Sequence, residues 1–461
     1  MSQPAVHNGP PPRVDAKTDV AIIGAGACGL TAALRAVAAG ADVLVLERDE
    51  SATGSTSLSS GFVPAAGTKY QAAIGVEDDA ETLVADLMGK SKGLSDPALA
   101  RLAATTIGRA VEWLGDQAGV EWIVLDDFLY PGHARHRMHA TPERTGAGLQ
   151  ARLLSAAERA GVPIATGARA TDLYVDGGLI THVAAARADG GEEIVACKAL
   201  VLACNGFGGA PDLVRKHIPE IADGPYFGHT GNTGDALIWG EALGAEARHL
   251  SGYQGHGSVA HPHGVLITWA LMMEGGVQVN ARGERFSNEH QGYSEQAVHV
   301  LAQPGGLAWN VYDEPLHEFA LAGFPDYRDA HAAGAVREAA DVGALAEIIG
   351  AQKAVLAATL AACKGVDGFG RDFSATRPLS PPYRALKVTG ALFHTQGGLM
   401  IDDQARVVDR AGRAFPNLFA GGGAACGVSG PDVSGYLSGN GLLTAIAFGW
   451  IAGNAAARGV R

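Results

Sequence analysis

The sequence has few cysteines and no cluster of basic residues. Its five cysteines are scattered along 461 residues without a CxxC pair, which argues against a disulfide framework or a zinc site and favours a reducing compartment. The formal net charge is −13, so the positive charge that attracts nucleic-acid phosphates is missing. We therefore expect no bound metal and no nucleic-acid partner.

Long uninterrupted apolar runs are also missing. A membrane-spanning helix needs about 18 or more apolar residues, and the nearest candidate is the stretch 442–457. Residues 1–14 are polar and rich in proline, without the charged start and apolar run of a secretory signal. We expect a cytoplasmic protein that does not insert into a membrane, with residues 1–14 as a flexible tail.

The composition that is present is typical of an α/β protein. Apolar residues make up 47% of the chain, charged residues 18%, and there are 64 glycines. Residues 18–48 follow the order strand, glycine turn, helix, strand, and the alternation over 165–187 predicts a small β meander. Helices are expected at 96–118, 146–160 and 441–456, and strands at 199–203, 398–402 and 418–420.

A region of different character interrupts this pattern at residues 226–383. It holds most of the histidines and a long helical stretch at 339–362. A chain of this length exceeds the usual size of one hydrophobic core. We therefore interpret 226–383 as a second domain inserted into a first one, which consists of residues 15–225 and 384–461.

A glycine-rich turn follows the first predicted strand. In Gly24-x-Gly26-x-x-Gly29 the first glycine permits the turn, the second lets the backbone approach a pyrophosphate, and the third lets helix pack on strand. Glu47 ends the next strand and can accept hydrogen bonds from ribose hydroxyls. This context favours dinucleotide binding over an ordinary tight turn, but the motif alone does not separate NAD from FAD.

The segment 54–61 is a loop rich in hydroxyl groups, suited to pyrophosphate oxygens and a flavin edge, although an ordinary surface loop has the same composition. With this loop, the chain resembles the fumarate reductase and succinate dehydrogenase flavoprotein superfamily, which includes the 3-ketosteroid dehydrogenases. The segments 201–207, 233–235, 394–402 and 438–442 match that superfamily as well. The resemblance implies an α/β fold with a Rossmann-like FAD-binding domain and an inserted α+β substrate (capping) domain.

The same resemblance implies which residues contact FAD. They lie in the glycine turn, at the end of the next strand, in the hydroxyl loop, at two later strand ends and in the final turn. They are Gly24, Gly26, Ala27, Cys28, Gly29, Glu47, Arg48, Ser55, Thr56, Ser57, Ser60, Gly61, Ala170, Ala203, Asn205, Gly206, Asp235, Gly423, Asn440, Gly441 and Leu442. The first loop has no histidine, so we expect FAD to be bound without a covalent link.

This sequence departs from the superfamily pattern in the cofactor site. Gly422 and Gly423 stand where relatives often carry an acidic residue, and Asn205 stands where a glycine is usual.

Two tyrosines stand where the fumarate-reducing relatives have arginines. Tyr293 follows the segment Arg285-Phe-Ser-Asn-Glu289, and Tyr436 precedes a Gly-Asn pair near the C-terminus. An arginine binds a carboxylate with two hydrogen bonds and stays charged, whereas a tyrosine offers a single neutral donor or, once ionised, a base. A dicarboxylate substrate is therefore disfavoured.

Tyrosines at these places resemble the 3-ketosteroid dehydrogenases, in particular the branch that forms a double bond between carbons 4 and 5. The resemblance implies that Tyr436 donates to the substrate carbonyl, that Tyr293 removes the α-proton and that Ser438 assists the proton relay. His256, His394 and Gly441 would contact the substrate. The alternative for each side chain is a buried aromatic or imidazole group satisfied by the backbone.

Three further histidines, His133, His136 and His139, have loop-like spacing with arginines between them. We interpret them as a solvated or pocket-entry loop, with metal binding as the less favoured alternative.

These observations predict an FAD-dependent dehydrogenase. It would introduce an α,β double bond into a cyclic ketone, either a 3-ketosteroid or a cyclohexanone-type ring, and pass electrons to an external acceptor such as a quinone, a dye or oxygen. One alternative is an ene-reductase of the fumarate reductase type. A third is a flavin-binding protein without turnover.

Overall fold

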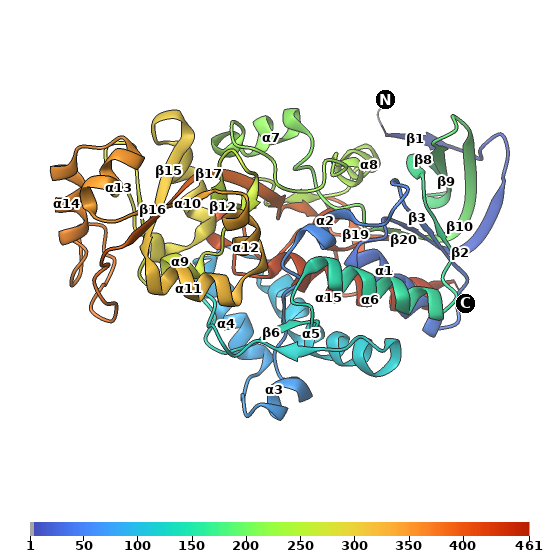
Figure 1. Ribbon diagram of the computed structural model, residues 1–461. Helices are drawn as coiled ribbons and strands as arrows, with labels where there is room; N and C mark the ends of the chain where they lie inside the picture. The colour runs from blue at the N-terminus through green and yellow to red at the C-terminus, as the bar shows by residue number, and fades with distance from the viewer. Residues whose placement is uncertain (1–3, 461) are drawn as a thin grey trace. The chain divides into compact units, whose positions relative to one another are not determined.

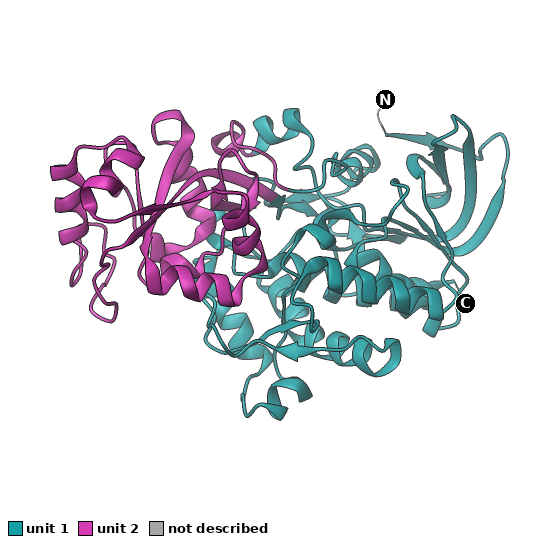
Figure 2. Ribbon diagram, viewed as in Figure 1, with its two compact units in different colours: residues 1–217, 228–253, 394–461 teal, residues 218–227, 254–393 magenta. Residues whose placement is uncertain are grey.

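The computed structural model describes residues 4–460 and divides the chain into two compact units (Figure 2). The first unit consists of residues 1–217, 228–253 and 394–461, and the second of 218–227 and 254–393. Compared with the predicted insertion at 226–383, residues 228–253 lie in the first unit and 384–393 in the second. The second difference arises because β17 (Tyr383–Thr395) pairs with two strands of the second unit.

A nine-stranded sheet forms the centre of the first unit (Figure 1). Its strands are β1 (Ala5–Asn8), β8 (Ala168–Asp176), β9 (Leu179–Arg187), β10 (Glu192–Leu202), β2 (Ala16–Ile23), β3 (Val43–Leu46) and β7 (Ile164–Ala165), in that order, with β20 (Ala414–Ala420) beside β10 and β19 (Arg406–Val408) beside β20. The strands β20, β10, β2, β3 and β7 are parallel, so their carboxyl ends meet at one edge. In an open parallel sheet this edge is where ligands bind.

Helices pack closely on this sheet. Two helices, α1 (Ala27–Ala38) and α15 (Asn440–Gly459), contact the strands, while α6 (Gly146–Arg159) packs on α1 and α5 (Pro97–Ala118) packs on α15. All four confirm the helices predicted near these positions. Small residues let α15 lie directly on α1: a Cβ at Gly449 would stand 2.5 Å from the Cys28 carbonyl oxygen, and one at Gly453 would stand 2.1 Å from that of Ala32. This contact fixes the N-terminus of α15 relative to the glycine turn.

Three local expectations were wrong. Residues 5–8 are not a flexible tail, because β1 pairs with β8, and residues 1–3 lie outside the described residues. The hydroxyl-rich loop contains a short helix, α2 (Gly54–Leu58). The helical stretch 339–362 is divided into β16 (Val336–Ala339), α13 (Val342–Ile349) and α14 (Lys353–Ala361), since Gly350 ends α13 with a φ of +83°.

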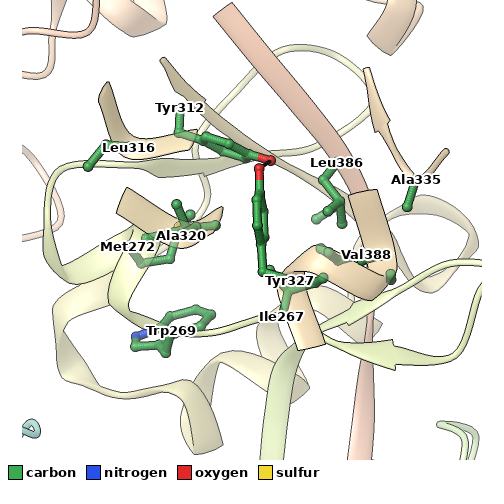
Figure 3. Close-up of a cluster of buried hydrophobic side chains, with 14 of the residues drawn as sticks. Ile267, Trp269, Met272, Tyr312, Leu316, Ala320, Tyr327, Ala335, Leu386 and Val388 are labelled. Carbon is green, nitrogen blue, oxygen red and sulfur yellow. Dashed lines mark hydrogen bonds between the residues drawn. The ribbon is translucent and has the colours of Figure 1, made fainter. Parts of the chain in front are cut away.

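A six-stranded sheet and its helices form the second unit. Its strands are β13 (Val265–Leu266), β12 (Tyr253–Ala260), β17, β15 (Leu307–Asp313) and β14 (Val277–Val279), in that order, with β16 beside β17. The helices are α9 (Ala270–Met273), α10 (Tyr293–Leu301), α11 (Glu314–Gly323), α12 (Pro325–Ala332), α13 and α14. In the core, the Tyr312 and Tyr327 hydroxyls lie 2.7 Å apart, so each buried tyrosine has a polar partner (Figure 3).

The remaining elements of the first unit are short. They are β4 (Val63–Pro64), α3 (Lys69–Ala73), α4 (Ala80–Lys90), β5 (Ile123–Val124), β6 (Met138–Ala140), α7 (Pro211–His217), α8 (Asp235–Leu243), β11 (Ala247–Arg248) and β18 (Gly398–Leu399). Within residues 4–460 no single helix has the length and apolar character to cross a membrane; the bent pair α13 and α14 passes that test together, by length and composition only.

Candidate active site

The glycine turn has no space for larger residues. Gly24 has a φ of +106°, and a Cβ on it would stand 2.5 Å from the Ala203 carbonyl oxygen at the end of β10. A Cβ on Gly29 would stand 1.8 Å from the Gly24 carbonyl oxygen, whereas one on Gly26 would meet only the Thr56 Oγ1, at 3.3 Å. The turn therefore leaves α1 with an N-terminus that starts at the sheet edge, the arrangement that binds an anionic phosphate.

Two side chains hold this turn in place. The Glu47 carboxylate accepts hydrogen bonds from the backbone N–H groups of Ala25, at 2.9 Å, and Asp49, at 3.0 Å. Thr56 Oγ1 accepts from the Ala27 N–H at 2.9 Å. Burial raises the pKa of the Cys28 thiol to about 12, so this residue can serve a phosphate only through its backbone.

The other predicted cofactor residues of the hydroxyl loop have varied surroundings. Ser55 Oγ accepts from Asn232 Nδ2 at 2.8 Å, and Ser57 Oγ donates to the carbonyl of Thr53, the residue just before α2, at 2.8 Å. Ser60 is exposed, while Gly61 is buried with a φ of +74° and its Cβ position 2.5 Å from the Thr145 carbonyl oxygen.

Further along the chain, the predicted residues lie at or near element ends. Arg48 donates to the Gly231 carbonyl at 3.1 Å, and Ala203 directly follows β10. Asp235 begins α8 and accepts from the Thr233 hydroxyl at 2.9 Å. Ala170, in contrast, is buried inside β8.

The structure links the two departures from the superfamily pattern. Asn205 has a φ of +66°, and its side-chain oxygen accepts from the Gly206 N–H at 2.9 Å. That oxygen lies 2.1 Å from the Cβ position of Gly423, so residue 423 can only be glycine while Asn205 keeps this conformation. The asparagine at 205 and the glycine at 423 are thus sterically coupled.

The N-terminus of α15 carries the last group of predicted FAD contacts. Asn440 is fully buried, and its Oδ1 has no hydrogen-bond partner among the described residues. Gly441 and Leu442 follow it in the first turn of the helix, where N–H groups lack intrahelical acceptors. A buried acceptor without a partner beside free helix N–H groups fits a polar ring such as that of a flavin.

Tyr436 and His394 lie together at this end of the first unit. Their rings are 5.5 Å apart at 76°. A Cβ on Gly441 would stand 2.9 Å from the His394 Cε1 and 3.0 Å from its Nε2, so only glycine leaves the imidazole in this position. Burial lowers the pKa of His394 to about 4, which leaves it neutral near pH 7.

A chain of three buried amide and hydroxyl groups supports His394. Gln396 Nε2 donates to the His394 Nδ1 at 3.0 Å, Ser429 Oγ donates to Gln396 Oε1 at 2.6 Å, and Asn440 Nδ2 donates to Ser429 Oγ at 2.9 Å. The sequence analysis missed Gln396 and Ser429. Gln396 stands two residues after His394 within the matched segment 394–402, which was a usable signal, whereas nothing in the sequence pointed to Ser429.

For His133, predicted to lie in a solvated or pocket-entry loop, the structure contradicts the solvated alternative. It is buried, its Nε2 lies 3.0 Å from the Ser438 carbonyl oxygen, and burial lowers its pKa to about 3. It therefore fixes the backbone of the turn that carries Tyr436 and Ser438, which is itself buried. His139 is also buried, bonded to Thr68, so these two are not solvated. Among residues 4–460 no group of three or more potential ligands could hold a metal ion.

Tyr293 and His256 form a second aromatic pair, in the second unit. Tyr293 begins α10, and its ring stacks on His256 of β12, with centroids 4.8 Å apart and an angle of 23°. Trp269 meets the imidazole edge-on at 5.8 Å. Burial lowers the pKa of His256 to about 3, so it too is neutral.

Ionic and polar contacts support the segment before Tyr293 and the helix α10 that it begins. The buried Glu289 carboxylate accepts from Arg285 and, at 3.0 Å, from Arg371, while its Oε1 accepts from the Gln278 N–H of β14. Gln278 is bonded to Gln296 of α10 at 2.8 Å. The arginine of the Arg-Phe-Ser-Asn-Glu segment is thus engaged by acids and positions the start of α10.

The comparison with protein families agrees with this geometry. Residues 19–442 match the model of the FAD binding domain family. The chain belongs to this family. The predicted dinucleotide-binding fold and the predicted cofactor, FAD, are confirmed. The assignment of individual residues to FAD stays a prediction.

Known relatives of this FAD-binding chain act on carbon–carbon bonds. It is 30% identical over 458 residues to a probable fumarate reductase of Shewanella frigidimarina, matching 96% of this chain and 75% of that protein. It is 27% identical to the 4-oxocyclohexanecarboxylate 2-dehydrogenase of Sinomonas cyclohexanicum, over 88% of this chain and 87% of that one.

Solved structures show the same two kinds of relative. A flavocytochrome c3 fumarate reductase has a TM-score of 0.82 at 28% identity, over 97% of this chain and 79% of that one. The 3-ketosteroid-delta4-(5alpha)-dehydrogenase of Rhodococcus jostii RHA1, in complex with 4-androstene-3,17-dione, has a TM-score of 0.77 at 26% identity. The match covers 97% of this chain and 98% of that one. The chain is an FAD-dependent oxidoreductase of the fumarate reductase family.

Proposed function

We propose that this oxidoreductase is a ketone dehydrogenase that introduces a double bond beside the carbonyl group of a cyclic ketone. The observation that carries the proposal is the pairing of a tyrosine with a neutral histidine in each unit, Tyr436 with His394 and Tyr293 with His256. The resemblance assigns arginines to both tyrosine positions in fumarate-reducing relatives. Tyrosine hydroxyls suit a neutral carbonyl oxygen better than a carboxylate.

Each of the proposed catalytic residues has its own role in the reaction. Tyr436 donates its hydroxyl to the carbonyl oxygen and stabilises the enolate that develops as the α-proton leaves. Tyr293 accepts that proton, and Ser438 passes protons to and from Tyr436. When bound, FAD supplies the acceptor for the hydride from the β-carbon, so the substrate loses one proton and one hydride.

The charges of both pairs favour a neutral substrate. Neither His256 nor His394 is protonated near pH 7, given pKa values of about 3 and about 4. Arg285 and Arg371 bind Glu289, and Arg285 also binds Asp367, so two carboxylates balance the two guanidinium groups. A dicarboxylate would therefore bring two negative charges to side chains that offer it no positive charge.

Two of the relatives support the same proposal and leave the ring size open. The cyclohexane-ring dehydrogenase and the ketosteroid dehydrogenase both act on cyclic ketones by their names. The second candidate is a fumarate-type ene-reductase, which the identity to a probable fumarate reductase favours. The two candidates run the same bond change in opposite directions.

Product analysis separates them. The holoenzyme is incubated with an electron-accepting dye and, in turn, a steroid ketone, a cyclohexanone and succinate. The proposal expects dye reduction and a conjugated enone, seen by its ultraviolet absorbance, with at least one cyclic ketone. Fumarate formed from succinate, with no enone from any ketone, would contradict it.

FAD attachment is tested separately. We propose that FAD is held without a covalent bond, so acid precipitation of the protein should release the yellow colour into the supernatant. A yellow pellet would contradict this.

A further inference from the structure

His394 is held at one ring nitrogen by a row of buried polar groups. Gln396, Ser429 and Asn440 are 4%, 1% and 0% exposed, so water does not compete for their hydrogen bonds. The bonds run in one line, from the Asn440 amide through the Ser429 hydroxyl and the Gln396 amide to the His394 Nδ1. Nδ1 also lies 3.4 Å from the Thr395 carbonyl oxygen. The contact with Gln396 is shorter, at 3.0 Å, so the direction of this row sets which ring nitrogen of His394 carries the proton.

The number of protons that each group can donate sets the direction of the hydrogen bonds in this row. Ser429 has one hydroxyl proton, and because it accepts from Asn440 Nδ2 it must donate to Gln396 Oε1. The other end of the Gln396 side chain is then an NH2 group, which donates to Nδ1. The reverse direction would place the Asn440 NH2 group where its Oδ1 now lies, buried without a partner. A buried donor without an acceptor is rarer than a carbonyl oxygen without a donor.

The free nitrogen faces the start of α15. The Cε1–Nε2 edge of the ring lies against the Cβ position of Gly441, and Tyr436 meets the ring edge-on. We infer that Gln396 is a positioning residue, which holds His394 as the tautomer with its proton on Nε2, so that His394 donates a second hydrogen bond, beside that of Tyr436, to the substrate carbonyl oxygen. This inference rests on the proposed function.

Nitrogen NMR on the FAD-loaded enzyme tests the tautomer directly. Histidine side chains are labelled with nitrogen-15, and the His394 signals are identified by their loss in His394→Gln. The inference expects an unprotonated Nδ1 and a protonated Nε2 at neutral pH. A proton on Nδ1 in the unaltered enzyme would overturn it. Because this readout needs no substrate, it remains valid if no ketone proves to be oxidised.

The variant Gln396→Glu reverses the hydrogen bond. A carboxylate accepts and does not donate, so the proton should move to Nδ1, leaving Nε2 as an acceptor that repels the carbonyl oxygen. Turnover of the ketone should fall about 10- to 100-fold. The matched control is Gln404→Glu, which adds the same charge at an exposed position of the same unit and should change neither readout.

Two further results would overturn the inference. One is an unchanged tautomer in a folded Gln396→Glu enzyme, and the other is a shifted tautomer with unchanged turnover. If Gln396→Glu does not fold, Ser429→Ala takes its place: it removes the proton that orients Gln396, and the His394 signals should then show a mixture of tautomers. An unmixed Nε2–H form in that variant would also overturn the inference.

Discussion

Tyr293 and His256 stack face to face, with ring centroids 4.8 Å apart and an interplanar angle of 23°, although they come from α10 and β12. Trp269 packs against both rings, at 5.8 Å and 6.4 Å. Ring contacts with His256 and Trp269 thus fix the side chain of Tyr293. Its hydroxyl can be removed without removing these contacts.

We expect Tyr293→Phe to lower turnover of the ketone by about 100-fold or more, because the proton acceptor is lost. The retained ring contacts should keep the melting temperature within a few degrees. Steady-state rates and thermal melts measure both effects. Tyr174→Phe is the matched control, since Tyr174 also stacks on a histidine, His7, at 5.0 Å and 29°. Equal rates for Tyr293→Phe and the unaltered enzyme would remove Tyr293 from the mechanism.

Gly441→Ala tests the position of His394. The new methyl group would stand 2.9 Å from Cε1 and must push the imidazole away from α15. We expect turnover to drop by about tenfold or more with FAD still bound. Gly459→Ala, at the far end of the same helix with nothing within 4 Å of its Cβ position, should leave turnover unchanged. A Gly441→Ala enzyme with unchanged turnover would show that turnover does not depend on this position of the His394 ring.

Gly29→Ala tests the phosphate turn. Its Cβ would meet the Gly24 carbonyl oxygen at 1.8 Å, so the turn must open and the helix N-terminus must move. We expect purified protein without flavin absorbance, or with FAD bound at least about 100-fold more weakly. Gly89→Ala, which meets nothing within 4 Å in α4, serves as the control. Normal flavin content in Gly29→Ala would refute the role of this turn.

The buried histidines predict how stability depends on pH. The pKa values of His133, His139 and His256 are lowered by burial to about 3, about 4 and about 3. In the unfolded chain each returns to about 6.5, so below that pH the unfolded state binds more protons than the folded state. Their contribution is complete above pH 6.5 and is lost as the pH falls toward 4 and 3.

The expected loss is about 1 kcal/mol for each of these histidines per pH unit below about 6.5. Urea unfolding at pH 7.5, 6.5 and 5.5 measures it. His139→Gln should flatten the dependence by removing one of the three groups. A free energy of unfolding that does not change between pH 7.5 and 5.5 would contradict the burial of these side chains.

Local patterns allowed much of the first unit to be predicted. The order strand, glycine turn, helix and strand around Gly24 is specified by short-range periodicity and by Gly24 and Gly29, where a Cβ would meet a backbone oxygen at 2.5 Å and 1.8 Å. The strand β1 was missed because four residues carry no periodic signal, and their pairing with β8 is a contact between distant segments. The break at Gly350 was missed because alanine-rich segments on both sides favour helix.

In the candidate site, too, local motifs could be read from the sequence and contacts between distant segments could not. Tyr293, Tyr436, His256 and His394 could be proposed as site residues because each stands at a fixed place in a motif, and their roles stay predictions. The support of His394 was not, since Ser429 lies 33 residues from Gln396 and meets it only in the folded chain. The burial of His133 likewise depends on its bond to Ser438, 305 residues away.

Anaerobic stopped-flow mixing of the oxidised holoenzyme with substrates, followed by the flavin absorbance near about 450 nm, tests the central claim most directly. Our account expects rapid bleaching by a steroid ketone or a cyclohexanone and none by succinate. Bleaching by succinate, with no response to any cyclic ketone, would contradict it.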